Sequence, residues 1–338
     1  MSIRKSFLYR AIANKQTEAN CEQWFELCRM LYNLALEQHI HAYRQQKKSI
    51  SAYEQMRQLV ELKKEYPEFK AVGSQALQDV LQRQDKAFKA FFRRCKQNNG
   101  KAGFPRFRGK DSYNSFTLKQ AGWKLEGRYL YIKGIGRFKL FLSRPIEGDI
   151  KTVTISRARS GKFFVAFSCD NVPVKPLPKT GKKISIDVGC EWFLTDTKGD
   201  PIANPRLLNK SEELIKMRQQ RVSHRIKGSN RRRKARVLLA KAHEKVANQR
   251  RDFHFKVAWN LVRKNDVIYI ENMKAWTTKY RRLNRSMRDV AWFGFFNILR
   301  FKATEAGREV IPVPARNTTQ KCFNCGRIVP KGLGDRVN

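Results

Sequence analysis

The sequence predicts a multidomain α+β protein in which helices, strands and an α/β unit occupy successive parts of the chain. Its 338 residues, 41% of them hydrophobic, are enough to bury more than one core. Early helical periodicity gives way at residue 99 to alternating apolar residues separated by glycine turns. A proline- and lysine-rich stretch, residues 173–181, then leads to a second half in which strands and helices alternate.

The N-terminal region is predicted to open with a strand and to continue as three helices. The strand RKSFLYRAI covers residues 4–12, and apolar residues at helical spacing follow it. A second helix runs from Tyr53 to about Tyr66, where Pro67 stops it. A third helix begins after Ser74, a suitable N-cap residue.

Strands are predicted beyond residue 99. The stretch NGKAGFPRFRGKDSYNSF mixes glycine, proline, basic and aromatic residues and cannot continue a helix. WKLEGRYLYIKGIGRFKLFL, residues 123–142, and KTVTISRARSGKFFVAFSC, residues 151–169, alternate between apolar and polar residues. This pattern predicts an antiparallel meander or a small barrel.

The second half is predicted to be an α/β unit. ISIDVGCEWFLTDTKGD, residues 184–200, indicates two strands joined by a turn. Between Lys216 and Arg251 the chain has fourteen Lys or Arg and one Glu, and apolar residues at helical spacing predict two long helices broken near KGSN. The strand VIYIEN, a helix around WFGFFNILRFKATEA and the strand REVIPVP complete the unit.

The charge points to a polyanionic partner. The 71 Lys and Arg against 29 Asp and Glu give a formal charge of +42, and such self-repulsion destabilises a compact chain unless a polyanion neutralises it. Nucleic acid is the expected polyanion. No stretch approaches the roughly 20 apolar residues that span a bilayer, and the N-terminus has no signal-peptide pattern, so we expect a cytoplasmic protein without a membrane partner.

Two acidic residues lie at the ends of predicted core strands. Asp187 follows the strand ISI, and Glu271 closes the strand VIYI. A carboxylate on a core strand needs a cation, a metal ion or exposure to solvent. If the two strands are neighbours, both carboxylates face one cleft and can bind Mg²⁺, which favours phosphodiester hydrolysis. The alternative is a turn aspartate and a solvated glutamate.

Two segments are candidates for nucleic-acid contact. In GFPRFRG, Arg106 and Arg108 can reach phosphates while Phe107 stacks on bases, although a surface turn with core phenylalanines explains the spacing equally well. The basic helical pair lies between the two acids in sequence, and its charge is too unbalanced for internal pairing. Its candidate contact residues are Lys227, Arg231, Arg232, Arg233, Lys234, Arg236, Arg250 and Arg251.

A possible zinc knuckle lies near the end of the sequence. Cys322 and Cys325 form a CxxC pair, the spacing of structural zinc ligands. Tetrahedral zinc needs four ligands, and no second knuckle follows in the 338 residues. The sequence therefore predicts an incomplete zinc site.

These stretches together resemble the TnpB family of transposon-encoded RNA-guided nucleases, regarded as ancestral to the CRISPR type V effectors. The motifs that carry the resemblance, in order, are FLYRAI, CRMLYN, SQALQDVLQRQDKAFKAFF, GFPRFRGKDSYNSF, ISIDVGCEWFLTDTKGD, NPRLL, KGSNRRRKARVLLAKAHEKVANQRRDFHFKVA, YIENM, GREVIPVPARNTTQKCFNCG and LGDRV. Their order and spacing agree over essentially the whole chain.

The resemblance implies an architecture. Residues 1–10 and 99–172 are expected to form an oligonucleotide-binding-like β-barrel (wedge), with residues 11–98 as a helical recognition insertion. After a linker at 173–181, residues 182–314 are expected to form a RuvC, ribonuclease-H-like nuclease domain, and 315–338 part of a zinc ribbon. We expect a monomer on its guide RNA.

The resemblance also implies roles. Asp187 and Glu271 correspond to the first two catalytic carboxylates, a transposon-end guide RNA pairs with one strand of target double-stranded DNA, and the protein reads a short target-adjacent motif. Candidate readers of this motif are Tyr53, Gln75, Gln78, Phe116 and Thr117.

The sequence departs from the family at its end. In the family a second CxxCG and a DRDxNA stretch follow, and an Asp of that stretch completes the acidic triad, whereas Asp335 in GDRVN matches the loop ahead of the second knuckle. The expected cofactors are Mg²⁺ and an incompletely held Zn²⁺, with cleavage weak or absent. The chain is then either a fragment of an active nuclease, which the intact Asp187 and Glu271 favour, or a shortened protein that binds without cutting and acts as a repressor. A plain basic RNA-binding protein is the third hypothesis.

Overall fold

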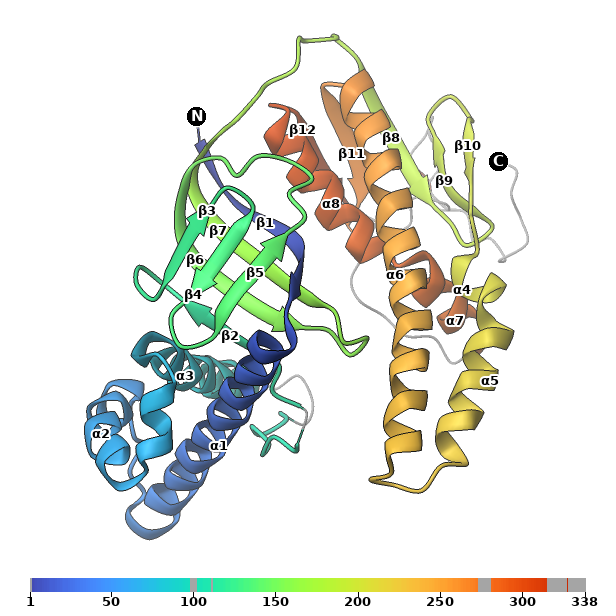
Figure 1. Ribbon diagram of the computed structural model, residues 1–338. Coiled ribbons are helices and arrows are strands. Elements are labelled where there is room, and N and C mark those ends of the chain that lie inside the picture. The colour runs from blue at the N-terminus through green and yellow to red at the C-terminus, as the bar shows by residue number, and fades with distance from the viewer. Residues whose placement is uncertain (1, 98–101, 111, 273–280, 315–326, 328–338) are drawn as a thin grey trace. The chain divides into compact units, whose positions relative to one another are not determined.

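The computed structural model describes residues 2–97, 102–110, 112–272, 281–314 and 327 (Figure 1). The chain divides into two compact units, Met1–Pro173 and Val174–Asn338, and each is described by itself. The predicted multidomain α+β composition is confirmed. Within the described part of the chain, no helix is both long enough and apolar enough to cross a membrane.

Unit 1 is built on a seven-stranded antiparallel sheet. Its hydrogen-bonded order is β2-β6-β7-β1-β5-β4-β3. The strands are β1 (Ser2–Ala13), β2 (Ser115–Leu118), β3 (Trp123–Glu126), β4 (Tyr129–Ile132), β5 (Gly136–Leu140), β6 (Asp149–Arg157) and β7 (Phe163–Pro173). Trp123 on β3 and Phe167 on β7 have ring centroids 6.5 Å apart although three strands separate them in the sheet order. Because neighbouring strands lie about 4.8 Å apart, the sheet must curl strongly.

Helices pack against this curled sheet (Figure 1). They are α1 (Lys15–Gln46), α2 (Ala52–Glu65), the 3₁₀ turn η1 (Pro67–Ala71) and α3 (Ser74–Gln97). The side chain of Asn14 caps α1 by accepting from the Thr17 N–H at 2.8 Å, and a Ser51–Glu54 capping box starts α2. Phe116 on β2 packs between Trp24 and Phe25 of α1, which joins the helices to the sheet.

Unit 2 contains a mixed five-stranded sheet in the order β10-β9-β8-β11-β12. Its strands are β8 (Lys183–Val188), β9 (Trp192–Asp196), β10 (Pro201–Ala203), β11 (Val267–Glu271) and β12 (Glu309–Val313). The strands β8, β11 and β12 run parallel, whereas β9 and β10 form antiparallel hairpin pairings. The parallel arrangement brings the ends of β8 and β11, far apart in sequence, to one edge of the sheet.

Five helices are described in unit 2. They are α4 (Leu207–Lys210), α5 (Glu212–Ser223), α6 (Asn230–Lys264), α7 (Arg281–Val290) and α8 (Trp292–Glu305). The predicted pair of basic helices is confirmed as α5 and α6, which separate where the Ser229 side chain caps α6 through the Arg232 N–H. Apolar residues of α6 and α8 form one core with β8 and β11. On α6, Leu238 is exposed, whereas Ala235 and Ala242 in the same stretch of the helix are buried.

The boundaries of the N-terminal strand and the linker differ from the sequence prediction. The first strand runs from Ser2 to Ala13, whereas the sequence predicted a strand over residues 4–12 and a barrel segment ending at residue 10, and β7 includes Pro173. The linker predicted at 173–181 is largely attached to unit 2, because the Leu177 N–H donates to the Ala306 carbonyl at 3.0 Å. Sequence composition predicted a spacer here but not that most of it packs on the following unit.

Candidate active site and nucleic-acid surfaces

Asp187 and Glu271 lie side by side at the ends of adjacent parallel strands. Strands β8 and β11 pair in a register that sets Ile186 opposite Ile270, so the two acids occupy the next position on each strand. Ile186 and Ile270 are buried, and their acidic neighbours point to the opposite, less buried face. The adjacency expected from the sequence is therefore present.

The two carboxylates disfavour each other's charge. Burial, followed by the negative charge of Asp187, raises the pKa of Glu271 above its usual range. Among the described side chains, neither acid has a cationic or hydrogen-bonding partner. A divalent cation between the two would relieve this repulsion, so the donor set fits Mg²⁺, a hard ion that prefers carboxylate oxygens.

The described residues offer two acids rather than a complete cluster. In that part of the chain no group of three or more His, Cys, Asp or Glu residues is placed to hold a metal ion. Mg²⁺ commonly binds through one or two carboxylates and completes its shell with water and phosphate oxygens. The pair can therefore hold such an ion against a phosphodiester but supplies few protein ligands.

The turn after Asp187 is held by residues of the NPRLL stretch. Asn204 donates to the Cys190 carbonyl at 2.7 Å, directly behind the turn. Farther on, the carboxylate of Asp289 accepts from the backbone N–H of Leu208 at 2.9 Å and forms an ion pair with Arg250 at 3.3 Å. These contacts connect the loop beside the candidate site to the body of α6.

This pairing assigns Arg250 a structural position. The Asp289 side chain is 5% exposed, so its charge needs the Arg250 guanidinium beside it. Sequence analysis grouped Arg250 with the nucleic-acid contacts, but an arginine committed to a buried carboxylate has fewer donors left for phosphate. Its neighbour Arg251 is exposed and stays a predicted contact. Sequence spacing could not separate the two because the partner lies 39 residues away.

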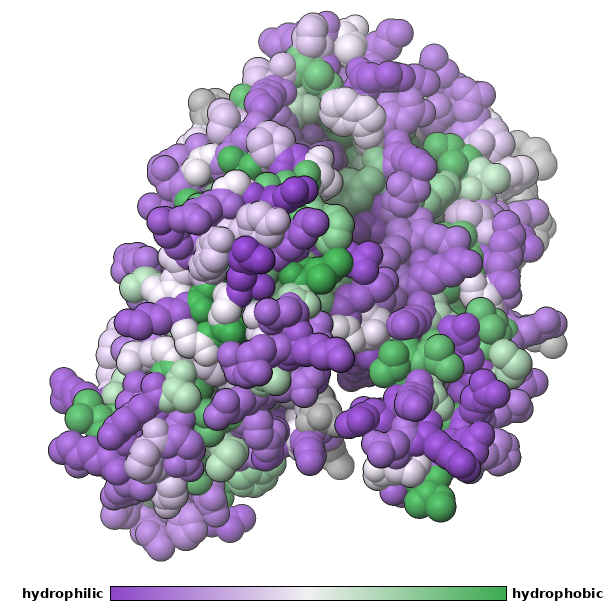
Figure 2. All heavy atoms as spheres, viewed as in Figure 1, coloured by the Kyte–Doolittle hydropathy of each residue, from purple (hydrophilic) through white to green (hydrophobic). Residues whose placement is uncertain are grey.

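The remaining basic residues of the α5–α6 pair are mostly exposed. Of the remaining predicted contact residues, the exposed ones are Lys227, Arg231, Arg233, Lys234 and Arg236. Arg232 instead is half-buried and donates to the Arg225 carbonyl at 2.9 Å, which holds the connection between the helices. Figure 2 shows that hydrophilic residues prevail on the visible face of this pair, with hydrophobic residues in small separate groups.

The GFPRFRG segment is anchored through its backbone on α1. Asn33 accepts from the Arg108 N–H at 2.8 Å and donates to the Arg108 carbonyl at 3.0 Å. The Arg108 guanidinium lies 5.4 Å from the centre of the Tyr32 ring, while Phe104 packs edge-on against helix α3. Arg106, Phe107 and Arg108 are all exposed, so the segment is a surface loop with fixed backbone and available cationic and aromatic groups.

A second cationic and aromatic surface on the sheet was not predicted from the sequence. Tyr129 and Tyr131 of β4 lie opposite Lys139 and Arg137 of β5, on the outward face of unit 1. The Arg137 guanidinium is 4.8 Å from the centre of the Tyr129 ring. The signal was present as alternating Tyr and cationic residues in RYLYIKGIGRFKL, which the sequence analysis used only to predict strands.

The candidate readers of a target-adjacent motif are in different environments. Phe116 is 0% exposed in the core, so its side chain supports the fold and does not reach a ligand. Thr117 is engaged with Arg83 and Thr154, and the Gln75 side-chain oxygen accepts from the Lys119 N–H at 2.8 Å. Gln78 is half-buried, and Tyr53 is exposed. Tyr53, Gln75 and Gln78 therefore stay predictions, whereas Phe116 is excluded as a direct contact.

The predicted zinc ligands Cys322 and Cys325 lie outside the described residues. The zinc-site prediction therefore stays a prediction. The fold and the paired acids together define a two-unit α+β protein with a candidate metal-binding site on a mixed sheet.

Comparisons with known proteins show which families the chain is similar to. A family model described as "Probable transposase" (OrfB_IS605) matches residues 166–286, a "Helix-turn-helix domain" model (HTH_OrfB_IS605) matches 1–48, and a "Cas12f1-like, TNB domain" model matches 292–337. A Streptomyces pristinaespiralis protein named as an RNA-guided DNA endonuclease is 29% identical over 96% of this chain and 81% of its own length. The similarly named InsQ of Escherichia coli K12 is 26% identical over 95% and 83%.

A solved structure has a similar fold. The Cas12f1 chain in a Cas12f1–sgRNA–target DNA complex, determined by cryo-electron microscopy, superposes with a TM-score of 0.56 at 11% identity, covering 97% of this chain and 92% of that one. In sequence the chain is therefore similar to OrfB_IS605 probable transposases and to proteins named as RNA-guided DNA endonucleases, in line with its resemblance to the TnpB family.

Proposed function

We propose that this protein is an RNA-guided DNA endonuclease of an insertion-sequence element. Its substrate is double-stranded DNA that pairs with a guide RNA derived from the transposon end and carries a short adjacent motif. The names of the Streptomyces and Escherichia relatives support the activity class, and the Cas12f1–sgRNA–target DNA complex supports RNA and DNA as partners. The chain acts as a monomer on its RNA.

The observation that carries the proposal is the register that sets Asp187 beside Glu271. Two carboxylates on adjacent strands, one with a raised pKa and neither with a cationic partner in the described chain, suit divalent-ion binding. Mg²⁺ bound there supplies activation of water and stabilisation of the leaving oxygen. In a RuvC-type nuclease unit, the Asp187 and Glu271 carboxylates would be the protein ligands that hold this ion.

Three surfaces are proposed to bind nucleic acid. The exposed cations of α5 and α6 neutralise phosphates, and the GFPRFRG loop adds Phe107 for stacking beside Arg106 and Arg108. The Tyr129–Arg137 face of unit 1 supplies a further aromatic and cationic platform.

A second candidate function is RNA-guided DNA binding without cleavage, which would repress transcription by occupancy. The absence of a third acid around Asp187 and Glu271, within the described residues, favours it. Because the described residues offer these two acids and no larger acidic cluster, we expect the 338-residue protein to cleave weakly or not at all.

Incubating the purified 338-residue protein with its guide RNA, matched DNA and Mg²⁺ separates the two functions. Cleavage that requires guide, match and Mg²⁺ supports the endonuclease, and tight matched binding without cleavage supports the second function. Equal binding of matched and unmatched DNA would contradict both and leave a basic RNA-binding protein.

A further inference from the structure

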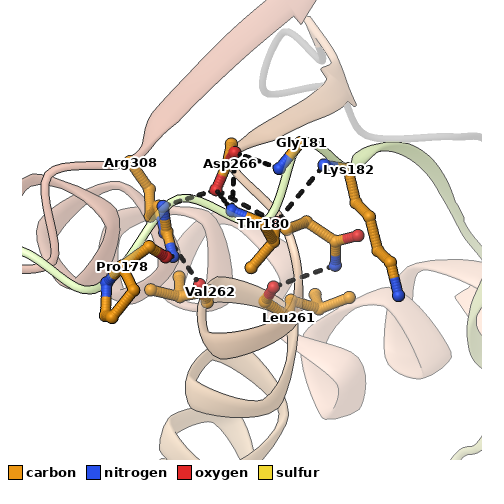
Figure 3. Close-up of polar contacts among 9 residues, drawn as sticks. Pro178, Thr180, Gly181, Lys182, Leu261, Val262, Asp266 and Arg308 are labelled. Carbon is orange, nitrogen blue, oxygen red and sulfur yellow. Dashed lines mark hydrogen bonds and ion pairs between the residues drawn. The ribbon is translucent and has the colours of Figure 1, made fainter.

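A cluster of polar contacts lies where the parallel strands of unit 2 begin, at the end away from the paired acids (Figure 3). This cluster, the clamp, consists of Thr180, Gly181, Asp266 and Arg308. The Asp266 carboxylate accepts from the Thr180 N–H at 2.9 and 3.0 Å, from the Thr180 hydroxyl at 3.0 Å and from the Gly181 N–H at 2.7 Å. Arg308 donates to the same carboxylate and, at 2.6 Å, to the Pro178 carbonyl.

Arg308 is the most deeply buried member. Its side chain is 2% exposed, and a buried guanidinium is tolerated only when acceptors surround it. Asp266 and the Pro178 carbonyl supply these, together with the Val262 carbonyl at 3.4 Å. The Thr180 N–H, the Gly181 N–H and the charge of Arg308 together hold the pKa of Asp266 below its usual range. The clamp is therefore a fully charged and mutually satisfied group.

Each part of the clamp lies just before a parallel strand. Thr180 and Gly181 precede β8, Asp266 directly precedes β11, and Arg308 directly precedes β12. Backbone hydrogen bonds continue the same connection, from the Asp266 N–H to the Lys182 carbonyl at 2.8 Å and from the Glu309 N–H to the Asp266 carbonyl at 3.0 Å. The three strand beginnings are thus joined by side chains as well as by the sheet.

We propose that the clamp positions the two acids by fixing the register of β8 against β11. The recorded pairing between these strands is short, from Lys183 opposite Val267 to Ile186 opposite Ile270. A slip of one residue would turn Asp187 toward the opposite face of the sheet, away from Glu271. The clamp opposes this slip at the strand beginnings. The inference rests on the proposed function, because a shared divalent ion is what requires the two acids in register.

The test is Mn²⁺ binding to the full 338-residue protein, measured by isothermal titration calorimetry well below the melting temperature of every variant. Asp266→Asn should weaken binding at the paired acids about tenfold or more, the scale found when groups that orient metal ligands are removed. The matched control is Asp252→Asn, which removes an exposed carboxylate paired with Lys256 on α6. It should leave binding within about twofold, as expected for a surface ion pair.

A milder variant covers the case in which Asp266→Asn does not fold. Thr180→Val removes one hydroxyl donor, keeps the Asp266–Arg308 pair and should weaken Mn²⁺ binding by a smaller factor. Hydrogen–deuterium exchange should also increase at the β8 amides in both variants. A purely structural role would lower the melting temperature while leaving the Mn²⁺ affinity of the folded protein unchanged.

The reference variant Asp187→Asn separates failure of this inference from failure of the proposed function. If it leaves Mn²⁺ binding unchanged, the proposed metal site is wrong. If it removes binding while Asp266→Asn and Thr180→Val bind like the unmodified protein, the clamp does not position the acids, and the proposed function stands.

Discussion

Acidic side chains have opposite environments at the two ends of the parallel strands β8 and β11. At the strand beginnings, Asp266 receives backbone N–H groups and a buried arginine. At the other ends, Asp187 and Glu271 face each other, and the described side chains supply no cation for either. A compensated acid stabilises the fold. The half-buried Glu271, whose pKa is raised by burial and by Asp187 and which receives no cation from the described side chains, suits a site that an external cation completes.

The strongest test of this difference is to remove one uncompensated charge. In conditions where the complex cleaves, Asp187→Asn should slow cleavage at least about a hundredfold, the lower range for losing a group that stabilises transition-state charge. Guide RNA affinity should not change. Gel-based cleavage kinetics measure the effect, with Ser185→Ala, an exposed residue on the same face of β8, as the control. Equal losses in both variants would mean that the strand, rather than the carboxylate, matters.

The same distinction between compensated and uncompensated charge applies to the basic helices. Replacing the exposed Arg231, Arg233, Lys234 and Arg236 by Gln should weaken guide RNA binding about tenfold to a hundredfold and reduce the slope of log affinity against log salt by about 3. Arg232 is left in place because it holds the Arg225 carbonyl. Filter binding across a salt series measures both effects.

A control protein of identical net charge makes this test specific. It carries Gln at four lysines, each of which is already paired with an acid: Lys64, Lys89, Lys256 and Lys302. Its salt slope should stay close to that of the unmodified protein. If both proteins lose affinity equally, overall charge rather than the α5–α6 surface attracts the RNA.

The sequence predicted the features that depend on local periodicity. The helices α2, α5 and α6 and the strands β8 and β11 follow from apolar spacing, caps and turns. From the sequence, the adjacency of Asp187 and Glu271 depended on their strands being neighbours, and the resemblance to the TnpB family implied it; the register of β8 against β11 sets the two acids side by side. The coarse fold and the location of the candidate site were therefore accessible without coordinates.

Pairings between residues distant in sequence could not be predicted in the same way. Arg250 and Asp289 both look like ordinary surface charges, and only the packing of α6 beside α4 and α7 makes them partners. The family resemblance placed Phe116 among the ligand contacts, but its side chain lies in the core of unit 1. Periodicity gives the face of one element, not the identity of the element that covers it.

His254 is a buried titratable side chain that stays neutral, unlike the charged and compensated Asp266. His254 is buried among aromatic rings, its Nε2 lies 3.0 Å from the Val290 carbonyl, and burial lowers its pKa from 6.5 to about 4, with the nearby Arg250 adding to the shift. Since the unfolded chain takes up this proton first, stability should be fully present above about pH 6.5 and decrease toward pH 4, by at most roughly 3 kcal/mol.

Denaturant unfolding at pH 7.5 and pH 5.0 measures this decrease. The variant His254→Gln lacks the titrating group and should lose less stability between the two pH values than the unmodified protein. An equal loss would mean that other groups, such as the carboxylates with lowered pKa, cause the acid sensitivity.

The smallest expected effect compares the two strand ends directly. Glu271→Gln should raise the melting temperature at pH 7.5 by about 1–3 °C, because it removes a charge that burial and Asp187 disfavour. Arg308→Gln should lower it by about 5 °C, because its buried hydrogen bonds and its charge partner are lost. Since the Glu271 pKa is raised, its penalty disappears as pH falls through that pKa, so the gain from Glu271→Gln should vanish near pH 4.

Divalent ions should reverse the order of the melting temperatures of the unmodified protein and Glu271→Gln. Adding Mg²⁺ should raise the melting temperature of the unmodified protein, because an ion that binds only the folded state stabilises it, and should not raise that of Glu271→Gln. Differential scanning fluorimetry with and without Mg²⁺ measures this. If Glu271→Gln is destabilising in the absence of metal, the acids are structural partners of groups in the chain, and the contrast between the two strand ends is not a sign of function.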